Sequence, residues 1–531
     1  MSSATQIHPA ASADRRWLVL VVVALAQLMV VLDSTIVNIA LPSAQRALTF
    51  SNGDRQWVVT AYALAFGSLL LPGGRIGDMF SRKWVFVTGL AGFAMSSALG
   101  GASVSFAMLI AARTLQGAFG ALLAPAALGT LVSTFTNPRE RGRAFGVFGS
   151  VAAGGGAVGL ILGGLLTQYL SWRYTLYVNL VFAAIAVAGA LAFIRSRSPA
   201  IRPRMDWPGS MLASTGLFLV VFGFSRAETA GWAAPLTIGS LVAGPLLLAA
   251  FVLAERRSPH PLLPLRVILD RTRGGSYVAV FLAGIALFGV FLFLTYYMQS
   301  VKGYSPLTTG LLFLPMVGCI LISSNLSSIV GLPRVGPRVL MASGMLLGAG
   351  ALAYLSKLTV TSTYQTSVLP ALLVLGLGFG MILSPAINTA TAGVRREDSG
   401  VASALVNTMQ QVGGSIGVSA LSTVALTTTA SYQAAHHSGA LATAIAVTRG
   451  YTTAFTVAAV VLGLGVILAV VMVPSRRRLA ELRTADHTSP ATAPPPAAEA
   501  IPVAVCGCSP VVNPDPGVAV SVGRVSAPTS S

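Results

Sequence analysis

QGAFGALLAPAAL, residues 116–128, returns later in the chain as LGLGFGMILSPAI, residues 375–387. In this alignment Gly120 matches Gly380, and Pro125 matches Pro385 at the same separation. Matches in the same order along both segments favour an internal repeat over chance matching of glycine-rich apolar segments. Three further glycines downstream have counterparts after a slip of two residues: Gly155, Gly156 and Gly159 match Gly413, Gly414 and Gly417.

The composition around this repeat is that of a membrane protein. The chain has 531 residues, of which 54% are hydrophobic and only 9% are charged, and its mean hydropathy is +0.77. A soluble chain of this length carries a much larger charged fraction. The net charge of +19 lies in short clusters between apolar runs and not in one basic patch, so no nucleic-acid partner is expected.

Runs of about 20 apolar residues, the length that crosses a bilayer as a helix, occur fourteen times. They are too long and too uniform for barrel strands. The predicted spans are 17–41, 56–73, 84–102, 106–133, 143–168, 173–194, 208–226, 236–254, 275–299, 308–331, 338–356, 366–391, 400–424 and 451–473.

The repeat relates spans 4 and 5 to spans 12 and 13, which is a shift of eight helices. The chain therefore divides into six spans, two inserted spans and six more. Parallel repeats of this kind are typical of transporters that bind their substrate between the halves. The predicted parts are an N-terminus (1–16), a first half (17–194), two inserted helices with their loops (195–274), a second half (275–474) and a tail (475–531).

Arginine-rich segments fall on one side of this arrangement. They are RSRSPAIRPR at 195–204, ERRSPHPLLPLRVILDRTR at 255–273 and RRR at 476–478. Cytoplasmic loops carry such an excess, so both termini are expected in the cytoplasm and the loop 425–450 outside. The expected localisation is multi-pass, in the inner (cytoplasmic) membrane.

The tail is rich in proline, alanine and threonine and is expected to be disordered. Its Cys506 and Cys508 lack a nearby histidine, and structural metal sites normally need four ligands. No metal is therefore expected.

GGRIGDMFSRK, residues 73–83, connects spans 2 and 3. Gly74 and Gly77 are expected to let two helices meet closely. Asp78 is expected near the start of span 3, where a negative charge suits the helix dipole. Arg82 and Lys83 are then expected to face the lipid headgroups or Asp78. We expect this segment to act in the conformational cycle.

This segment resembles the loop 2–3 signature of the major facilitator superfamily. LDSTIVNIALP (32–42) resembles the first-span signature of its fourteen-span drug:proton antiporters, and RTLQGAFGA (113–121) resembles their span 4 signature. GLILGG (159–164) resembles their span 5 signature, and WRYTLYVN (172–179) resembles the segment after that span.

The resemblance implies an all-α major facilitator fold and proton-coupled export of small hydrophobic drugs or antibiotics. The energy source it implies is the proton gradient, with no cofactor, and we expect a monomer. Two departures concern span 5 and the segment after it. Leu160 stands where the family usually has proline, and Leu180 and Val181 follow Asn179 without the usual proline.

Asp33 and Arg113 are the formal charges that lie well inside the predicted spans. Counted at about 1.5 Å per residue, both lie roughly 10–12 Å below the outer surface. The repeat counterpart of Arg113 is Leu373, so symmetric packing does not require the pair. A structural salt bridge is one interpretation. We favour a proton-coupling pair in which Arg113 stays charged and Asp33 changes protonation.

Uncharged polar residues inside the spans outline a cavity near the middle of the membrane. The chain also has 23 phenylalanines and 14 methionines, which suit an apolar, adaptable pocket. Such polar side chains either contact a substrate or bond to other helices, and the sequence leaves both open. The cavity candidates are Gln27, Ser34, Asn38, Gln116, Tyr296, Tyr297, Gln299, Asn388, Asn407, Gln410 and Gln411.

Glycines at four-residue spacing form small-residue faces on spans 5 and 13. We interpret them as helix-packing glycines, with rocking of the two halves as a functional alternative. The residues are Gly155, Gly159, Gly163, Gly413 and Gly417.

The sequence thus predicts an exporter of hydrophobic drugs or antibiotics. A transporter of one dedicated metabolite in the same fold is the alternative. A membrane-embedded enzyme or receptor is more remote, because no metal-ligand cluster, nucleotide loop or soluble catalytic domain is evident in the sequence.

Overall fold

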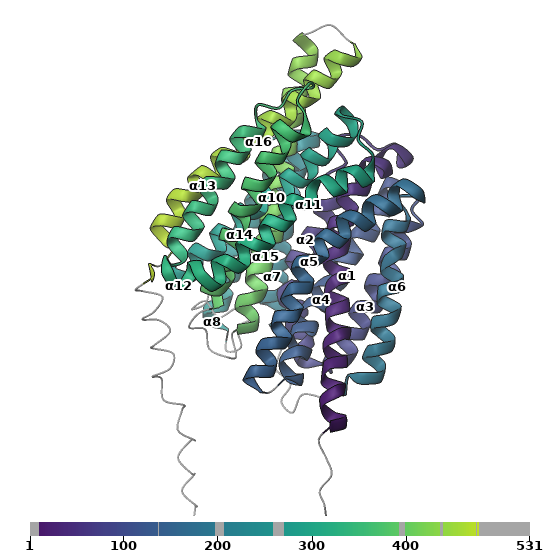
Figure 1. Cartoon of the computed structure of the whole chain (residues 1–531), viewed down its shortest axis with the longest axis vertical. Coiled ribbons are helices and arrows are strands. Elements are labelled where there is room, and N and C mark those ends of the chain that lie inside the picture. The colour runs from purple at the N-terminus through teal and green to yellow at the C-terminus, as the bar shows by residue number, and fades with distance from the viewer. Residues whose placement is uncertain are drawn as a thin grey trace, which may run out of the picture. The chain divides into compact units, whose positions relative to one another are not determined.

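The computed structural model describes residues 10–135, 137–196, 206–258, 270–391, 399–435, 439–473 and 475–476. Within these ranges every regular element is helical (Figure 1). The first half and the inserted pair comprise α1 (Ala10–Leu48), α2 (Trp57–Met79), α3 (Arg82–Gly101), α4 (Phe106–Thr134), α5 (Pro138–Tyr169), α6 (Tyr174–Phe193), α7 (Trp207–Ala230) and α8 (Pro235–Arg257). The second half comprises α10 (Arg271–Tyr296), η1 (Tyr297–Val301), α11 (Pro306–Leu326), η2 (Ser327–Gly331), α12 (Leu332–Arg334), α13 (Pro337–Leu355), η3 (Tyr364–Val368), α14 (Leu369–Thr391), α15 (Ser399–Ala435) and α16 (Ala440–Met472).

Thirteen of the described helical segments are long and apolar enough to cross a membrane, and a shorter apolar segment, Trp57–Leu70, lies in α2. Each predicted span falls on one of these segments. The predicted limits of the 425–450 loop are wrong, because α15 continues to Ala435 and α16 begins at Ala440. This stretch is rich in alanine, which favours helix whether or not lipid surrounds it, whereas hydropathy detects only the apolar part.

The two halves repeat the same packing. In the first half α4 packs on α2 and α3, and in the second half α14 packs on α11 and α13. Likewise α1 packs on α5 and α10 packs on α15. These pairs correspond under the shift of eight helices, so the sequence repeat is also a repeat of helix contacts.

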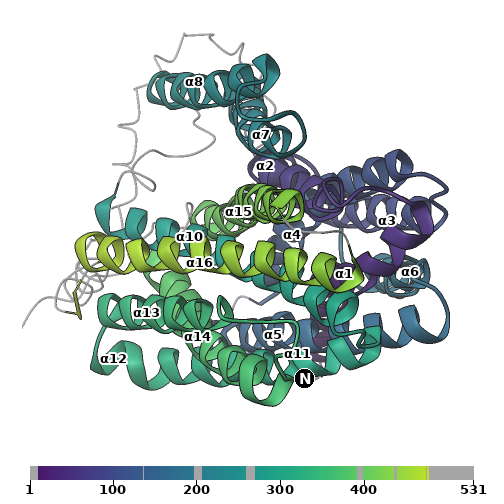
Figure 2. The ribbon, with the colours of Figure 1, turned by 90° about the horizontal axis from the view of Figure 1, so that it is seen from above.

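The inserted helices α7 and α8 pack against each other on one side of the bundle (Figure 2). Helix α7 contacts both halves: Ser214 Oγ donates to the Ser68 carbonyl of α2 at 2.8 Å, and the hydroxyls of Ser225 and Ser419 on α15 lie 2.6 Å apart. Helix α7 therefore covers the seam between α2 and α15.

The halves meet most closely at the end of the bundle that carries residues 49–56, called here the α1–α2 end. The largest apolar cluster joins both halves, and its first-half members come from parts of the helices nearest that end, such as Ile36, Phe50 and Val58. At the same end Leu307 N of α11 donates to Gln168 Oε1 of α5 at 3.3 Å. The halves are thus closed against each other there.

Candidate functional site

A fully buried ion pair joins α1 to α4. Arg113 Nη1 lies 2.7 Å from Asp33 Oδ2, and the two side chains are 2% and 0% exposed. A buried charge is retained only where it is paired and hydrogen-bonded, because removal from water is costly. The structure thus brings together the two charges that the sequence places at equal depth.

Three neutral side chains from three helices complete the surroundings of Asp33. Gln116 Nε2 on α4 and Asn179 Nδ2 on α6 each donate to Asp33 Oδ1 at 2.8 Å. The same two amide groups donate to Ser97 Oγ on α3, at 3.1 and 3.0 Å. Both carboxylate oxygens of Asp33 therefore accept hydrogen bonds, and one network ties α1, α3, α4 and α6 together.

Arg113 is held equally firmly. Its Nη1 also donates to Gln116 Oε1 at 2.7 Å, and its Nε donates to the Val58 carbonyl of α2 at 3.2 Å. Its guanidinium lies 4.5 Å from the centre of the Tyr62 ring, a cation–π distance. The guanidinium stays protonated, so Arg113 is a fixed positive charge in this site.

Asn179, Ser97 and Tyr62 were not among the predicted site residues. The signal available for Asn179 and Ser97 was that each is a polar residue within an apolar helix, and both are 0% exposed. Sequence spacing does not reveal which of many such residues turn toward Asp33, because that depends on how four helices are rotated against one another.

Gln116, Tyr296, Tyr297 and Gln299 were predicted to line a cavity, but each bonds to protein. Gln116 belongs to the Asp33 network. Tyr296 Oη donates to Gln45 Oε1 at 2.7 Å, and Gln299 Nε2 donates to the Ile39 carbonyl at 3.0 Å, both across the two halves. Tyr297 Oη donates to the Thr359 carbonyl at 2.7 Å. These residues tie helices together in this state.

The remaining cavity candidates lie on α1, α14 and α15. Two bond to their own helix: Ser34 Oγ donates to the Val31 carbonyl and Asn388 Nδ2 donates to the Ser384 carbonyl. Asn38 does the same toward the Ser34 carbonyl and is largely buried. Asn407 is exposed. The other three side chains are half-buried: Gln27, Gln410 and Gln411.

The GGRIGDMFSRK segment differs from its predicted arrangement. Asp78 lies in the last turn of α2 and not at the start of α3, so its expected place at a helix N-terminus is wrong. Arg82 Nη1 donates to the Gly129 carbonyl of α4 at 3.0 Å, and Lys83 Nζ donates to the Leu191 carbonyl of α6 at 2.8 Å. Both cations thus bond to helix carbonyls within the first half.

The close helix approach in this segment lies at Gly73, which was not among the predicted residues. A Cβ at Gly73 would overlap the backbone carbonyl of Ala121 on α4. One at Gly74 would make ordinary contact with Pro125, and one at Gly77 would meet no described residue within 4 Å. The close contact expected at Gly77 is therefore not found among the described residues.

The glycine faces of α5 and α15 lie against the first helix of each half. A Cβ at Gly163 would lie 2.7 Å from Ile36 Cγ1, and one at Gly417 would lie 2.6 Å from Ile285 Cα on α10. Three others also face those helices: Gly155 and Gly159 lie against α1, and Gly413 lies against the Phe281 carbonyl. Helix α5 runs unbroken through Leu160, the position where proline was expected.

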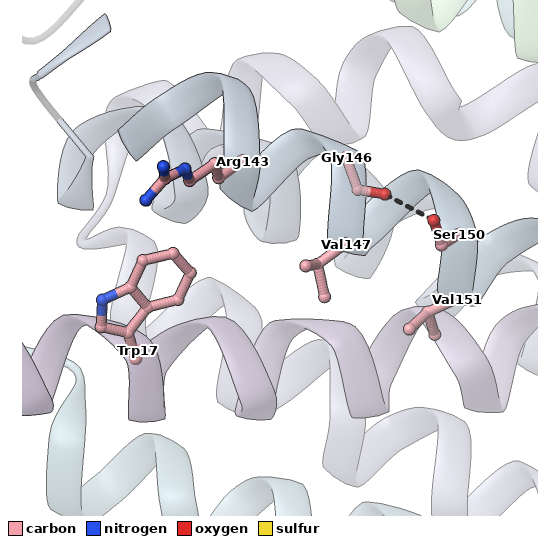
Figure 3. A pocket seen from close by; sticks show the side chains of 6 residues that line it. All are labelled: Trp17, Arg143, Gly146, Val147, Ser150 and Val151. Atoms are coloured by element: carbon pink, nitrogen blue, oxygen red, sulfur yellow. Dashed lines mark hydrogen bonds between the residues drawn. The ribbon is translucent and has the colours of Figure 1, made fainter. Parts of the chain in front are cut away.

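A separate cavity of about 640 Å³ lies between the beginnings of α1 and α5 (Figure 3). Trp17 of α1 faces Arg143 and Val147 of α5 across it. Trp17 is sixteen residues before Asp33, or about 24 Å along the helix. The other lining residues are Gly146, Ser150 and Val151, and none of the six was predicted.

Comparisons with known proteins agree with this architecture. The sequence profile described as Major Facilitator Superfamily matches residues 23–418. The chain is 48% identical over 479 residues to the puromycin resistance protein of Streptomyces alboniger, covering 90% of this chain and 95% of that protein. It is 40% identical to the cephamycin export protein of Amycolatopsis lactamdurans, covering 76% and 84%. A tetracenomycin C resistance and export protein of Streptomyces glaucescens is 36% identical, covering 77% and 75%.

Solved structures share the fold at low sequence identity. A bacterial homologue of the human lysosomal transporter Spinster has a TM-score of 0.60 at 16% identity, covering 90% of this chain and 99% of that one. A POT family transporter has a TM-score of 0.62 at 14% identity, covering 85% and 97%. The many apolar helices and the bacterial relatives make this a multi-pass cell membrane protein and a transporter, not an enzyme. The chain belongs to the major facilitator superfamily.

Proposed function

We propose that this protein is a proton-coupled exporter of small, largely hydrophobic antibiotics or related toxic compounds. The observation that carries the proposal is the Asp33–Arg113 pair, buried at 0% and 2% exposure within apolar helices. Ionisable residues inside membrane segments are costly, and they commonly serve ion or proton pathways.

The coupling step follows from the hydrogen bonds around Asp33. In the state described here, Arg113, Gln116 and Asn179 all donate to its carboxylate, an arrangement that suits the ionised form. A proton binds Asp33 when a movement of α1 against α4 or α6 weakens these bonds. Return of the helices to the state described here then releases the proton to the side opposite the α1–α2 end, so that proton movement accompanies the cycle of the two halves.

The substrate class rests on the relatives. Three of them are named for resistance to, or export of, single antibiotics: puromycin, cephamycin and tetracenomycin C. These names support an antibiotic as the substrate and outward transport as the direction. Because each name refers to one antibiotic, the names also support a second candidate function. In it the protein exports one compound only and is not a broad multidrug exporter.

The proposed topology has fourteen spans and both termini in the cytoplasm. The thirteen membrane-length segments and the shorter Trp57–Leu70 segment support the span count. The arginine-rich segments support the orientation. In this orientation the α1–α2 end faces outside, so the closed contact between the halves there corresponds to an inward-facing state.

Substrate range is tested by drug sensitivity in a pump-deficient bacterial host. Expression of the chain should raise the tolerated concentration of at least one antibiotic in a chemically diverse panel that begins with puromycin. Protection against one compound alone favours the narrow exporter, and protection across unrelated compounds favours the broad one. No change for any compound would contradict antibiotic export.

Proton coupling is tested with Asp33→Asn, which nearly preserves shape but removes the ionisable group. In vesicles with an imposed pH gradient, we expect this variant to lose gradient-driven transport when the rate is normalised to the amount of variant protein in the membrane. Asp54→Asn is the matched control, because Asp54 lies in the loop between α1 and α2, outside the membrane-length segments, and accepts a hydrogen bond from Ser51 Oγ. Normal gradient-dependent transport by Asp33→Asn would assign the proton to another group.

A further inference from the structure

Arg55 is a buried cation that the proposed transport chemistry does not use. It lies in the loop between α1 and α2, and it is only 3% exposed. Its guanidinium carbon lies 4.3 Å from the centre of the Tyr296 ring on α10 and 5.4 Å from that of Tyr451 on α16. Its Nη1 also donates to Tyr451 Oη at 3.1 Å. An arginine of the first half is therefore enclosed by two aromatic residues of the second half.

Other bonds between the halves lie close to this cluster. Tyr296 Oη reaches back to Gln45 near the end of α1, and Gln299, about one turn further along the chain, bonds to the Ile39 carbonyl. Tyr296 and Tyr451 are 3% and 4% exposed. Arg55 is thus part of a contact that excludes water at the α1–α2 end, where guanidinium–aromatic attraction is strongest.

Several buried polar groups near this contact have no hydrogen-bond partner within the described part of the chain. Both polar atoms of the Gln56 side chain are of this kind, as are Thr60 Oγ1 on α2 and Thr295 Oγ1 beside Tyr296. All three residues are 0% exposed. Burying such groups is unfavourable, and hydration on opening relieves it. The contact therefore combines the attraction between Arg55 and two aromatic rings with buried polar groups that favour separation of the halves.

We propose that Arg55, Tyr296 and Tyr451 form the latch that closes the α1–α2 end of the transporter, called here the Arg55 latch. The latch holds the halves together in the state described and separates when that end opens. The buried polar side chains of Gln56, Thr60 and Thr295 oppose it, because opening exposes them to water. The inference rests on the proposed transport function in one respect: the protein must alternate between a state open at one end and a state open at the other. It does not depend on proton coupling or on the identity of the substrate.

The test measures how readily reagents reach buried sites behind the latch. In a full-length background with Cys319, Cys506 and Cys508 replaced by serine, Thr60→Cys and Thr295→Cys serve separately as reporters, one in each half. A membrane-impermeant thiol reagent is added to the side that carries the α1–α2 loop, which is identified with a Cys placed at exposed Asn52. We expect Arg55→Ala to raise the labelling rate of both reporters about tenfold, the order of effect of a desolvated cation–π contact.

The matched control is Arg46→Ala. Arg46 is exposed at the same end, and its side chain bonds within α1, to the Pro42 carbonyl and Ser43 Oγ. This variant should label at the parental rate. An equal rise in the labelling rate of Arg46→Ala, or no rise in that of Arg55→Ala, would overturn the latch. A rise seen only when the reagent is added to the opposite side of the membrane would also overturn it.

A series at Tyr451 keeps the test decisive if Arg55→Ala reaches the membrane poorly. Tyr451→Phe keeps the ring and loses the hydroxyl, and Tyr451→Leu loses both, so labelling should rise in that order. Parental labelling in Tyr451→Leu would overturn the proposal. Since the reagent needs neither a pH gradient nor a substrate, failure of proton coupling at Asp33 leaves this readout unaffected.

Discussion

At the scale of single residues, the dominant feature is a pair of charges kept where charges are costly. Arg113 lies 2.7 Å from Asp33, and the side-chain amides of Gln116 and Asn179 donate to the other carboxylate oxygen. Breaking a buried pair leaves one charge uncompensated and typically costs about 3–5 kcal/mol. The effect of substituting one member on the stability of the protein therefore depends on whether the other is still charged, and this holds whatever their part in transport.

Arg113→Leu, which introduces the residue found at the repeat position Leu373, should destabilise the protein by about 3–5 kcal/mol. The reason is the ionised Asp33 left without its cation. Adding Asp33→Asn removes that charge, so the double variant should recover much of the lost stability while transport stays absent. Thermal unfolding of detergent-purified protein and membrane abundance check this. Equal stability of the single and double variants would mean that the pair is not energetically coupled.

At the scale of helices, small residues set how closely neighbours approach. Helix α2 meets α4 at Gly73, where a side chain would overlap the Ala121 backbone. Helices α5 and α15 meet α1 and α10 in the same manner through Gly163 and Gly417. Close approach of this kind drives association in lipid, where apolar surfaces gain nothing by leaving the solvent.

Two glycines of α2 provide a matched comparison. Gly73→Ala should destabilise the protein by about 1–3 kcal/mol, the usual effect of forcing extra atoms into a packed contact. Gly77→Ala should be neutral or slightly stabilising, because no described residue lies within 4 Å of its added Cβ and alanine is the better helix former. Thermal unfolding of both variants in the same detergent checks this. An equal loss of thermal stability in the two variants would show that the two positions are equally crowded.

At the scale of the whole molecule, two similar halves close on each other at one end, and an inserted helix pair lies beside the seam. Helix α7 bonds to α2 through Ser214 and to α15 through Ser225, so it touches both halves. The second seam, between α5 and α11, brings Leu160 and Gly310 together, and within the described residues neither α7 nor α8 packs on it. The two seams of the transporter are therefore unequal.

The proposed orientation is tested with two exposed positions at opposite ends of the first half. In the cysteine-free background, Asn52→Cys should react with an impermeant thiol reagent added to intact cells, and Ser196→Cys should react only after the membrane is opened. The expectation follows from the arginine-rich segments on the side of Ser196. Labelling of Ser196→Cys in intact cells with none at Asn52→Cys would reverse the orientation.

The sequence by itself determined the elements and the family. Hydropathy is a local property, and each predicted span lies on a described helix, although the ends of α15 and α16 were missed. The internal repeat determined which helices are equivalent, and the signatures at residues 32–42, 73–83 and 113–121 identified the superfamily that the profile matches. Asp33 and Arg113 stood out because few charges lie inside apolar runs.

Only the tertiary structure decided which polar residues meet. Asn179 and Ser97 join Asp33, Gln116 bonds within the first half, and Tyr296 closes on Arg55. Glycines of one motif likewise differ: a Cβ at Gly73 would overlap the Ala121 backbone, and one at Gly77 would meet no described residue within 4 Å. The physical reason is that a polar side chain in an apolar helix must find a partner, and the partner depends on helix rotation and depth. Those are set by packing among several helices, which no single stretch of sequence contains.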